Sequence, residues 1–133
     1  MIVQLEIVVK LILAVALGGL IGIEREKSHK PAGIRTHMLV ALGACLFTIS
    51  SMNLGMDSAR IAAGIVTGIG FIGAGTIISS GKNIKGITTA ASLWTTSAVG
   101  LLVGIGEYFI STIATLFILI ILLLDFMIKK WLK

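Results

Sequence analysis

The stretch Gly68-Ile69-Gly70-Phe71-Ile72-Gly73-Ala74-Gly75 places four glycines within eight residues, with no polar residue between them. Its first three glycines match the G-x-G-x-x-G dinucleotide fingerprint, which requires a strand before it and a helix after it. Here the stretch lies inside the run 61–78, which contains no charged residue. In such a run, glycines remove side chains so that two helix backbones can approach closely. The stretch therefore favours packing of membrane helices over nucleotide binding, with local loosening of the helix as a second use of the glycines.

The composition of the whole chain also indicates a membrane protein. Of its 133 residues, 56% are hydrophobic and 13% are charged, whereas about 25% of residues are charged in a typical soluble domain. The mean hydropathy is +1.07. No long polar stretch could hold a separate soluble domain, so we expect one embedded domain over residues 1–133. The single cysteine, Cys45, lies in an apolar run, which excludes an intramolecular disulfide and a cysteine metal cluster.

Five apolar runs predict five membrane-spanning helices and hence an all-α, polytopic membrane helix bundle. The predicted spans are residues 5–23, 36–52, 61–78, 87–105 and 108–128, and their lengths are near the roughly 20 residues that cross a bilayer. The segment 24–37 is strongly charged and contains the only proline, so we expect a loop there. The segment 79–86 contains turn-forming residues and two lysines, which predicts a tight turn.

Glycines recur at four-residue spacing in several of these spans, as they do on helix faces that pack closely in lipid. Such faces join helices of one chain, or copies of a homo-oligomer, of which a dimer is favoured here. The residues expected in helix packing are Gly18, Gly22, Gly64, Gly68, Gly70, Gly73, Gly75, Gly100 and Gly104.

The basic residues indicate how the chain is oriented. Most of them lie in three segments: the loop after span one, the turn after span three and the tail. Five spans place all three segments on one side, which the positive-inside rule makes cytoplasmic, with the N-terminus outside. The net charge of +5 then needs no nucleic-acid partner, because anionic membrane lipid attracts these segments. They contain Arg25, Lys27, Lys30, Arg35, Lys82, Lys85, Lys129, Lys130 and Lys133.

On the external side, Asp57 lies at the expected start of the third helix, where its carboxylate can cap the helix. It precedes Arg60 by three residues, a spacing that allows the two side chains to pair.

Polar residues from four helix ends are expected to meet at the cytoplasmic face. An anionic group, such as a lipid phosphate or a carboxylate of a partner, could bind there at the helix N-termini. Alternatively, Glu24 and Glu26 pair with Arg25 and Arg35 and fix the loop. The candidate interaction residues are Glu24, Arg25, Glu26, Arg35, Thr36, His37, Thr88, Thr89 and Trp94.

The positions of the acidic residues argue against a magnesium pathway through a single chain. Mg²⁺ takes oxygen ligands and loses its water reluctantly, yet all six acids lie at or near the ends of predicted spans. A pore lined by backbone carbonyls near residues 68–75 of an oligomer is left open. We predict no metal site, no cofactor and no enzyme activity, because no spacing of Ser, His and Asp indicates a triad. The six acids are Glu6, Glu24, Glu26, Asp57, Glu107 and Asp125.

Five motifs resemble the membrane domain of the MgtC/SapB family. They cover residues 22–26, 32–37, 60–63, 68–75 and 86–94, in the order found in the family. The resemblance implies a multi-span protein of the bacterial inner membrane, linked to growth at low magnesium, to survival inside host cells and to inhibition of the rotary ATP synthase. Many relatives continue into a cytoplasmic soluble domain, whereas this sequence stops at Lys133, so we expect no such domain here.

We therefore expect a non-enzymatic regulator that binds a membrane partner, which could be the ATP synthase, an ion transporter or a second copy of the chain. The alternative is a small Mg²⁺ transporter or channel formed by an oligomer.

Overall fold

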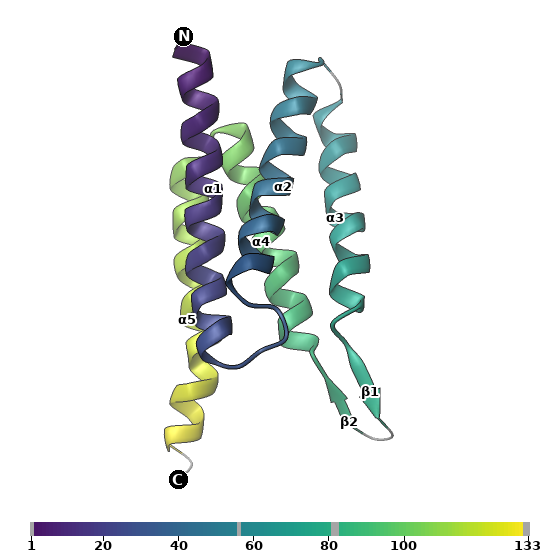
Figure 1. Ribbon diagram of the computed structural model, residues 1–133, viewed down its shortest axis with the longest axis vertical. Helices are drawn as coiled ribbons and strands as arrows, with labels where there is room; N and C mark the ends of the chain where they lie inside the picture. The colour runs from purple at the N-terminus through teal and green to yellow at the C-terminus, as the bar shows by residue number, and fades with distance from the viewer. Residues whose placement is uncertain (1, 56, 81–82, 132–133) are drawn as a thin grey trace.

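The computed structural model describes residues 2–55, 57–80 and 83–131, and in them five helices run side by side (Figure 1). An all-α helix bundle is therefore confirmed for the described residues. The helices are α1 Ile2–Lys27, α2 Ile34–Asn53, α3 Ser58–Ala74, α4 Ile87–Ile105 and α5 Tyr108–Trp131.

The lengths and the apolar composition of the helices fit a membrane. Among the described residues, α1, α2 and α4 are long and apolar enough to cross a bilayer. Helix α3 has 17 residues and is therefore about 26 Å long, slightly less than the roughly 30 Å hydrocarbon core. Helix α5 is apolar over Tyr108–Leu124 and continues to Trp131.

The predicted loop 24–37 is shorter in the structure. Helix α1 continues through Lys27 and α2 already begins at Ile34. The extra turn of α1 is stabilised by the Ser28 hydroxyl, which donates to Glu24 Oε1 at 2.7 Å. The extended α1 carries Glu24 and Arg25 on a helix, which fixes the direction of their side chains.

The third helix ends at Ala74, four residues earlier than predicted, and a short hairpin replaces its last turn. Strand β1, Ile78–Ser80, pairs antiparallel with β2, Asn83–Lys85. The Thr76 hydroxyl donates to Gly73 O at 2.7 Å and covers the end of α3. Gly86, at φ +92°, then opens α4, and the Thr76 carbonyl occupies the place of a Cβ there. Only glycine fits both conditions.

The core lies between α1, α2 and α4, and α5 packs against it. Its buried residues are Ala14, Leu17, Ala41, Cys45, Ile49, Val99 and Val103. Helix α3 stands outside this core, next to α2 in Figure 1, and contacts α4 more extensively than α2. Only Ile69 and Gly73 of α3 are buried.

Glycines bring α2 close to both of its main neighbours. A Cβ added at Gly18 would lie 2.6 Å from His37 O, and one at Gly22 would lie 2.6 Å from the Ile34 Cα. On the other side of α2, a Cβ at Gly100 would overlap the Ala41 carbonyl, and one at Gly104 would lie 2.7 Å from the Thr48 Cβ. At these glycines the backbone of α2 is in close contact with the backbones of α1 and α4.

The glycine-rich stretch of α3 makes much less contact. A Cβ at Gly73 would lie 3.4 Å from the Ala90 Cβ of α4, and one at Gly75 would face the carbonyl of Ile72 in its own turn. Within the described chain, nothing lies within 4 Å of a Cβ placed at the other three glycines of α3, which are Gly64, Gly68 and Gly70.

The connections divide between two ends of the bundle. The α1–α2 connection, the hairpin and the C-terminal end of α5 lie at one end, called the loop end below, at the bottom of Figure 1. The N-terminus and the other two connections lie at the opposite end. There, Asp57 Oδ1 caps α3 by accepting from Ala59 N at 3.0 Å and from Arg60 N at 3.4 Å. Lys82 and Lys133 are outside the described residues.

Candidate functional site

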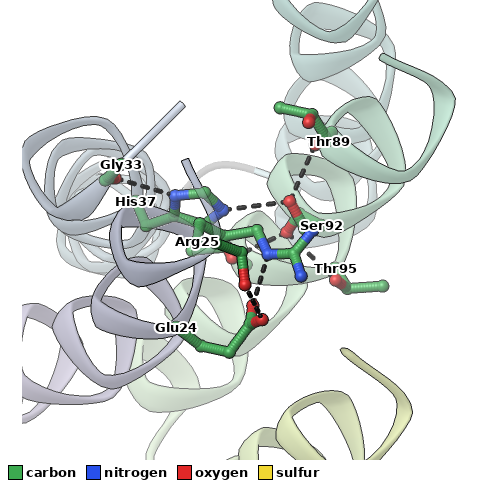
Figure 2. A network of polar contacts seen from close by, with 9 residues as sticks. Glu24, Arg25, Gly33, His37, Thr89, Ser92 and Thr95 are labelled. Atoms are coloured by element: carbon green, nitrogen blue, oxygen red, sulfur yellow. Dashed lines mark hydrogen bonds and ion pairs between the residues drawn. The ribbon is translucent and has the colours of Figure 1, made fainter. Parts of the chain in front are cut away.

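The last turn of α1 places an arginine inside the bundle. Arg25 is 2% exposed, and its Nε donates to Glu24 Oε2 (Figure 2). Figure 2 shows the guanidinium directed across to α4, beside Ser92. Its Nη1 is buried and has no hydrogen-bond partner among the described residues. A buried guanidinium is costly unless it is paired, so the Glu24 carboxylate is part of what keeps Arg25 inside.

The first turn of α2 contributes a buried imidazole. His37 is 0% exposed, and its Nδ1 donates to Gly33 O at 2.9 Å because a carbonyl can only accept. Its Nε2 lies 3.0 Å from Ser92 Oγ on α4. Ser92 Oγ also lies 2.8 Å from Thr89 O, to which its hydroxyl can donate. His37 thus connects the start of α2 to the start of α4 (Figure 2).

Glu26 closes the N-terminus of α2. The N-cap residue, Gly33, has no side chain to cap the helix, and Glu26 Oε2 accepts instead from Ile34 N at 3.0 Å. The carboxylate is also favoured there by the positive end of the helix dipole. A Cβ at Gly33 would overlap the Glu26 carboxylate, so glycine at position 33 is what lets Glu26 reach the helix.

Helix α4 presents hydroxyls to these groups along one face. Thr89, Ser92 and Thr96 are 2%, 3% and 0% exposed and follow one another at helical spacing. Thr96 donates to Ser92 O at 2.7 Å. Such hydroxyls donate to carbonyl groups of their own helix, so they can be buried in the bundle without an unsatisfied hydrogen-bond donor. The loop-end network is defined here as Glu24, Arg25, Glu26, Gly33, His37, Thr89 and Ser92.

The structure brings together five of the nine candidate interaction residues: Glu24, Arg25, Glu26, His37 and Thr89. The other four lie outside the network. Arg35 and Thr88 are exposed, and Trp94 is 49% exposed on α4. Thr36 lines a groove between α2 and α3.

Sequence reasoning missed Gly33 and Ser92 as members of the network. Ser92 belongs to a pattern of hydroxyl residues three and four apart, which indicates a polar helix face. Nothing local, however, pairs Ser92 with His37, because the two residues are 55 positions apart. Gly33 acts through its carbonyl and through its missing side chain. The sequence shows only that the residue is a glycine, which does not indicate either role.

The contact between His37 and Ser92 resembles the base and nucleophile of serine hydrolases, but its surroundings differ. In a triad a carboxylate orients the histidine, whereas here the second ring nitrogen meets the Gly33 carbonyl. Both residues are also buried, so a substrate has no access to the hydroxyl in this conformation. Among the described residues, no group of three or more His, Cys, Asp or Glu side chains could hold a metal ion. The arrangement fits a structural joint between helices.

Comparison with known proteins matches the family model described as "MgtC family" over residues 11–131. The chain is 48% identical over 113 residues to Protein MgtC of Salmonella typhimurium (strain LT2), covering 84% of this chain and 49% of that protein. It is 50% identical over 108 residues to Protein MgtC of Brucella abortus (strain 2308), covering 80% of this chain and 45% of that protein.

A third relative is named "Putative magnesium transporter YhiD", from Escherichia coli (strain K12). It is 42% identical over 127 residues, covering 88% of this chain and 59% of that protein. The chain thus spans about half the length of the curated relatives it matches. No solved structure matches the chain.

Proposed function

Because the chain belongs to the MgtC family, we propose that this membrane protein regulates a membrane partner without catalysis, in adaptation to low magnesium or host-cell stress. The partner is an ion-transporting protein or the ATP synthase, as the family resemblance implies, and a second copy of the chain is a further partner. The membrane is the bacterial inner membrane. The loop end faces the cytoplasm, because the described basic connections gather there.

The observation that carries this proposal is the internal use of polar groups at the loop end. Glu24 pairs with Arg25, Glu26 caps α2, and His37 bonds to Gly33 and Ser92. These contacts join α1, α2 and α4 into a fixed end of the bundle. A fixed surface favours partner binding because little side-chain freedom is lost on association.

The exposed residues next to this network supply the contact surface. Arg35 is exposed in the first turn of α2, and Trp94 is half exposed on α4. Arginine and tryptophan are enriched among the few residues that dominate binding energy at interfaces. We therefore assign the partner contact to Arg35, Thr88 and Trp94. The loop-end network holds in place the helix ends that carry these residues.

Quantitative co-purification from native membranes tests this assignment. A variant carrying Arg35→Ala and Trp94→Ala is expected to recover at least tenfold less partner than wild type, since hot-spot truncations cost about 2 kcal/mol or more each. The matched control carries Glu107→Ala and Phe109→Ala, which remove one exposed charged residue and one exposed aromatic residue at the opposite end. Equal partner recovery from both double variants contradicts the proposal.

Ion transport by an oligomer is the second candidate function. It is supported by the name of the Escherichia coli relative and by the open positions at Gly64, Gly68 and Gly70 of α3, where a second copy could bring backbone carbonyls together. The test is Mg²⁺ flux into liposomes that contain the purified protein. Flux that is present with wild type and absent with Gly70→Leu would favour this function. Absence of Mg²⁺ flux together with partner capture favours regulation.

A further inference from the structure

A groove lies between α2 and α3, with a volume of about 690 Å³. It exists because α3 leans on α4 and contacts α2 less. Gly43 on α2 and Gly64 and Gly68 on α3 face it, and none of them has an atom within 4 Å of an added Cβ. The missing side chains widen the groove along its length.

The lining of the groove determines what can fill it. All lining residues except Thr36 and Arg60 are apolar or glycine. Water needs two to four polar partners to occupy a buried site, so the middle of the groove does not hold water. An empty space of this size would forfeit the dispersion contacts of its walls. The occupant in a bilayer is therefore hydrocarbon.

The dimensions distinguish an acyl chain from a helix. From Arg60 to Ile72 the α3 wall covers about 18 Å at 1.5 Å per residue, close to one leaflet of a hydrocarbon core of about 30 Å. A helix of about 10 Å diameter over that length would need about 1,400 Å³, twice the volume of the groove. Volumes of about 300–1,000 Å³ are usual for small-molecule sites. The groove thus fits an acyl chain and is too small to enclose a helix.

A positively charged side chain, that of Arg60, lies at one end of the groove. Arg60 lines it near the start of α3, at the opposite end of the bundle, where the membrane surface is expected. Its side chain forms no ion pair within the described part of the chain. The neighbouring Asp57 uses Oδ1 for the backbone N–H groups of Ala59 and Arg60. The guanidinium is left available, and its planar fork of donors matches a phosphate group.

We propose that the groove binds one phospholipid, with an acyl chain between α2 and α3 and the lipid phosphate on Arg60. The lipid holds α3 at its distance from α2 and completes the packing of the bundle. This site is separate from the loop-end network and does not depend on the proposed partner.

Native mass spectrometry of the full chain, purified in the presence of phosphatidylethanolamine and phosphatidylglycerol, tests this site. Wild type is expected to retain one phospholipid. Gly68→Leu fills the groove and should reduce retention at least tenfold, and Arg60→Gln should reduce it about tenfold because a hydrogen bond to a charged group is lost. Gly70→Leu is the matched control, because Gly70 is equally open on α3 but does not line the groove.

Circular dichroism of each variant establishes that the helices are intact, and Gly64→Leu repeats the test at a second open position. Retention by Gly68→Leu and Gly64→Leu equal to wild type overturns the proposal, as does wild type that retains no lipid. A wild-type dimer that retains no lipid and dissociates on Gly68→Leu would instead assign the groove to a second copy, and likewise overturns it.

Discussion

The Ser92 hydroxyl, which meets the His37 ring, has two possible acceptors and only one proton to donate. Nδ1 donates to Gly33 O, so in a neutral ring Nε2 is an acceptor. The single proton of the Ser92 hydroxyl then goes either to Nε2, at 3.0 Å, or to Thr89 O, at 2.8 Å. Only the first arrangement makes a hydrogen bond between α2 and α4, because Thr89 lies on the same helix as Ser92.

Removal of that hydroxyl by Ser92→Ala is expected to lower the free energy of unfolding by about 1–3 kcal/mol, because the buried Nε2 loses its partner. Thr112→Ala is the control: Thr112 is exposed and donates to Tyr108 O in its own helix, so its loss should cost less than about 0.5 kcal/mol. Unfolding in detergent, followed by circular dichroism, measures both. Equal effects of the two changes would show that the His37–Ser92 contact contributes nothing.

Arg25 shows which properties of a side chain can be predicted from the local sequence and which cannot. The charged run 24–27 allows Glu24 to pair with Arg25, and the structure contains that pair. The burial of Arg25 to 2% exposure was not predicted, because it depends on α2 and α4 closing over the last turn of α1. Exposure of a charged side chain is set by neighbours that are distant in sequence.

Two pairs of glycines explain the tight grouping of α1, α2 and α4. Gly18 and Gly22 face α2 from α1, and Gly100 and Gly104 face it from α4. In lipid, where the surroundings are as apolar as the helices, close backbone approach is a main source of attraction between helices. Helix α2 is therefore held on two sides, and this places His37 between Gly33 and Ser92.

Substitution at one of these contacts should separate the helices. Gly100→Ala is expected to lower the free energy of unfolding by about 1–3 kcal/mol, because the new methyl overlaps the Ala41 carbonyl. Gly43→Ala is the control on α2, where nothing lies within 4 Å of the added carbon, and its effect should stay within about 1 kcal/mol. Titration with sodium dodecyl sulfate compares them, and similar midpoints for both variants would refute the packing argument.

Helix α3 departs from its sequence-based prediction in length and in packing. The apolar run 61–78 predicted one continuous span, but the chain leaves the helix after Ala74 and enters the hairpin. Hydropathy does not show where a helix ends inside an apolar run, and residues 75–78 are apolar or small although the helix has already ended. The four glycines of 68–75 also predicted close helix contact, and only Gly73 lies at van der Waals distance from another helix of the described chain.

The distribution of charged residues over the molecule predicts its orientation in the membrane. Arg25, Lys27, Lys30, Arg35 and Lys85 lie on segments that reach the loop end, and Asp57 and Glu107 lie at the opposite end. The positive-inside rule is the ground for our proposal that the loop end faces the cytoplasm. With five crossings, this proposal predicts an external start of α1 and a cytoplasmic end of α5.

Labelling with a membrane-impermeant maleimide tests this direction. Glu107→Cys should react in intact cells, whereas Lys85→Cys should react only after permeabilisation. The native thiol adds little background, because Cys45 is 0% exposed. The reverse pattern of labelling would invert the orientation and would place the proposed partner surface outside the cytoplasm.

The amino-acid sequence was sufficient for the class of the protein, the existence of five apolar helices and part of the residues gathered at the loop end. These features follow from composition, hydropathy and motif order, which are local properties of the chain. The partners of each polar atom, the burial of Arg25, the hairpin after α3 and the groove beside it were decided by tertiary packing. The physical reason is that a hydrogen bond or a void belongs to two or more helices at once, and their approach depends on contacts along their whole length.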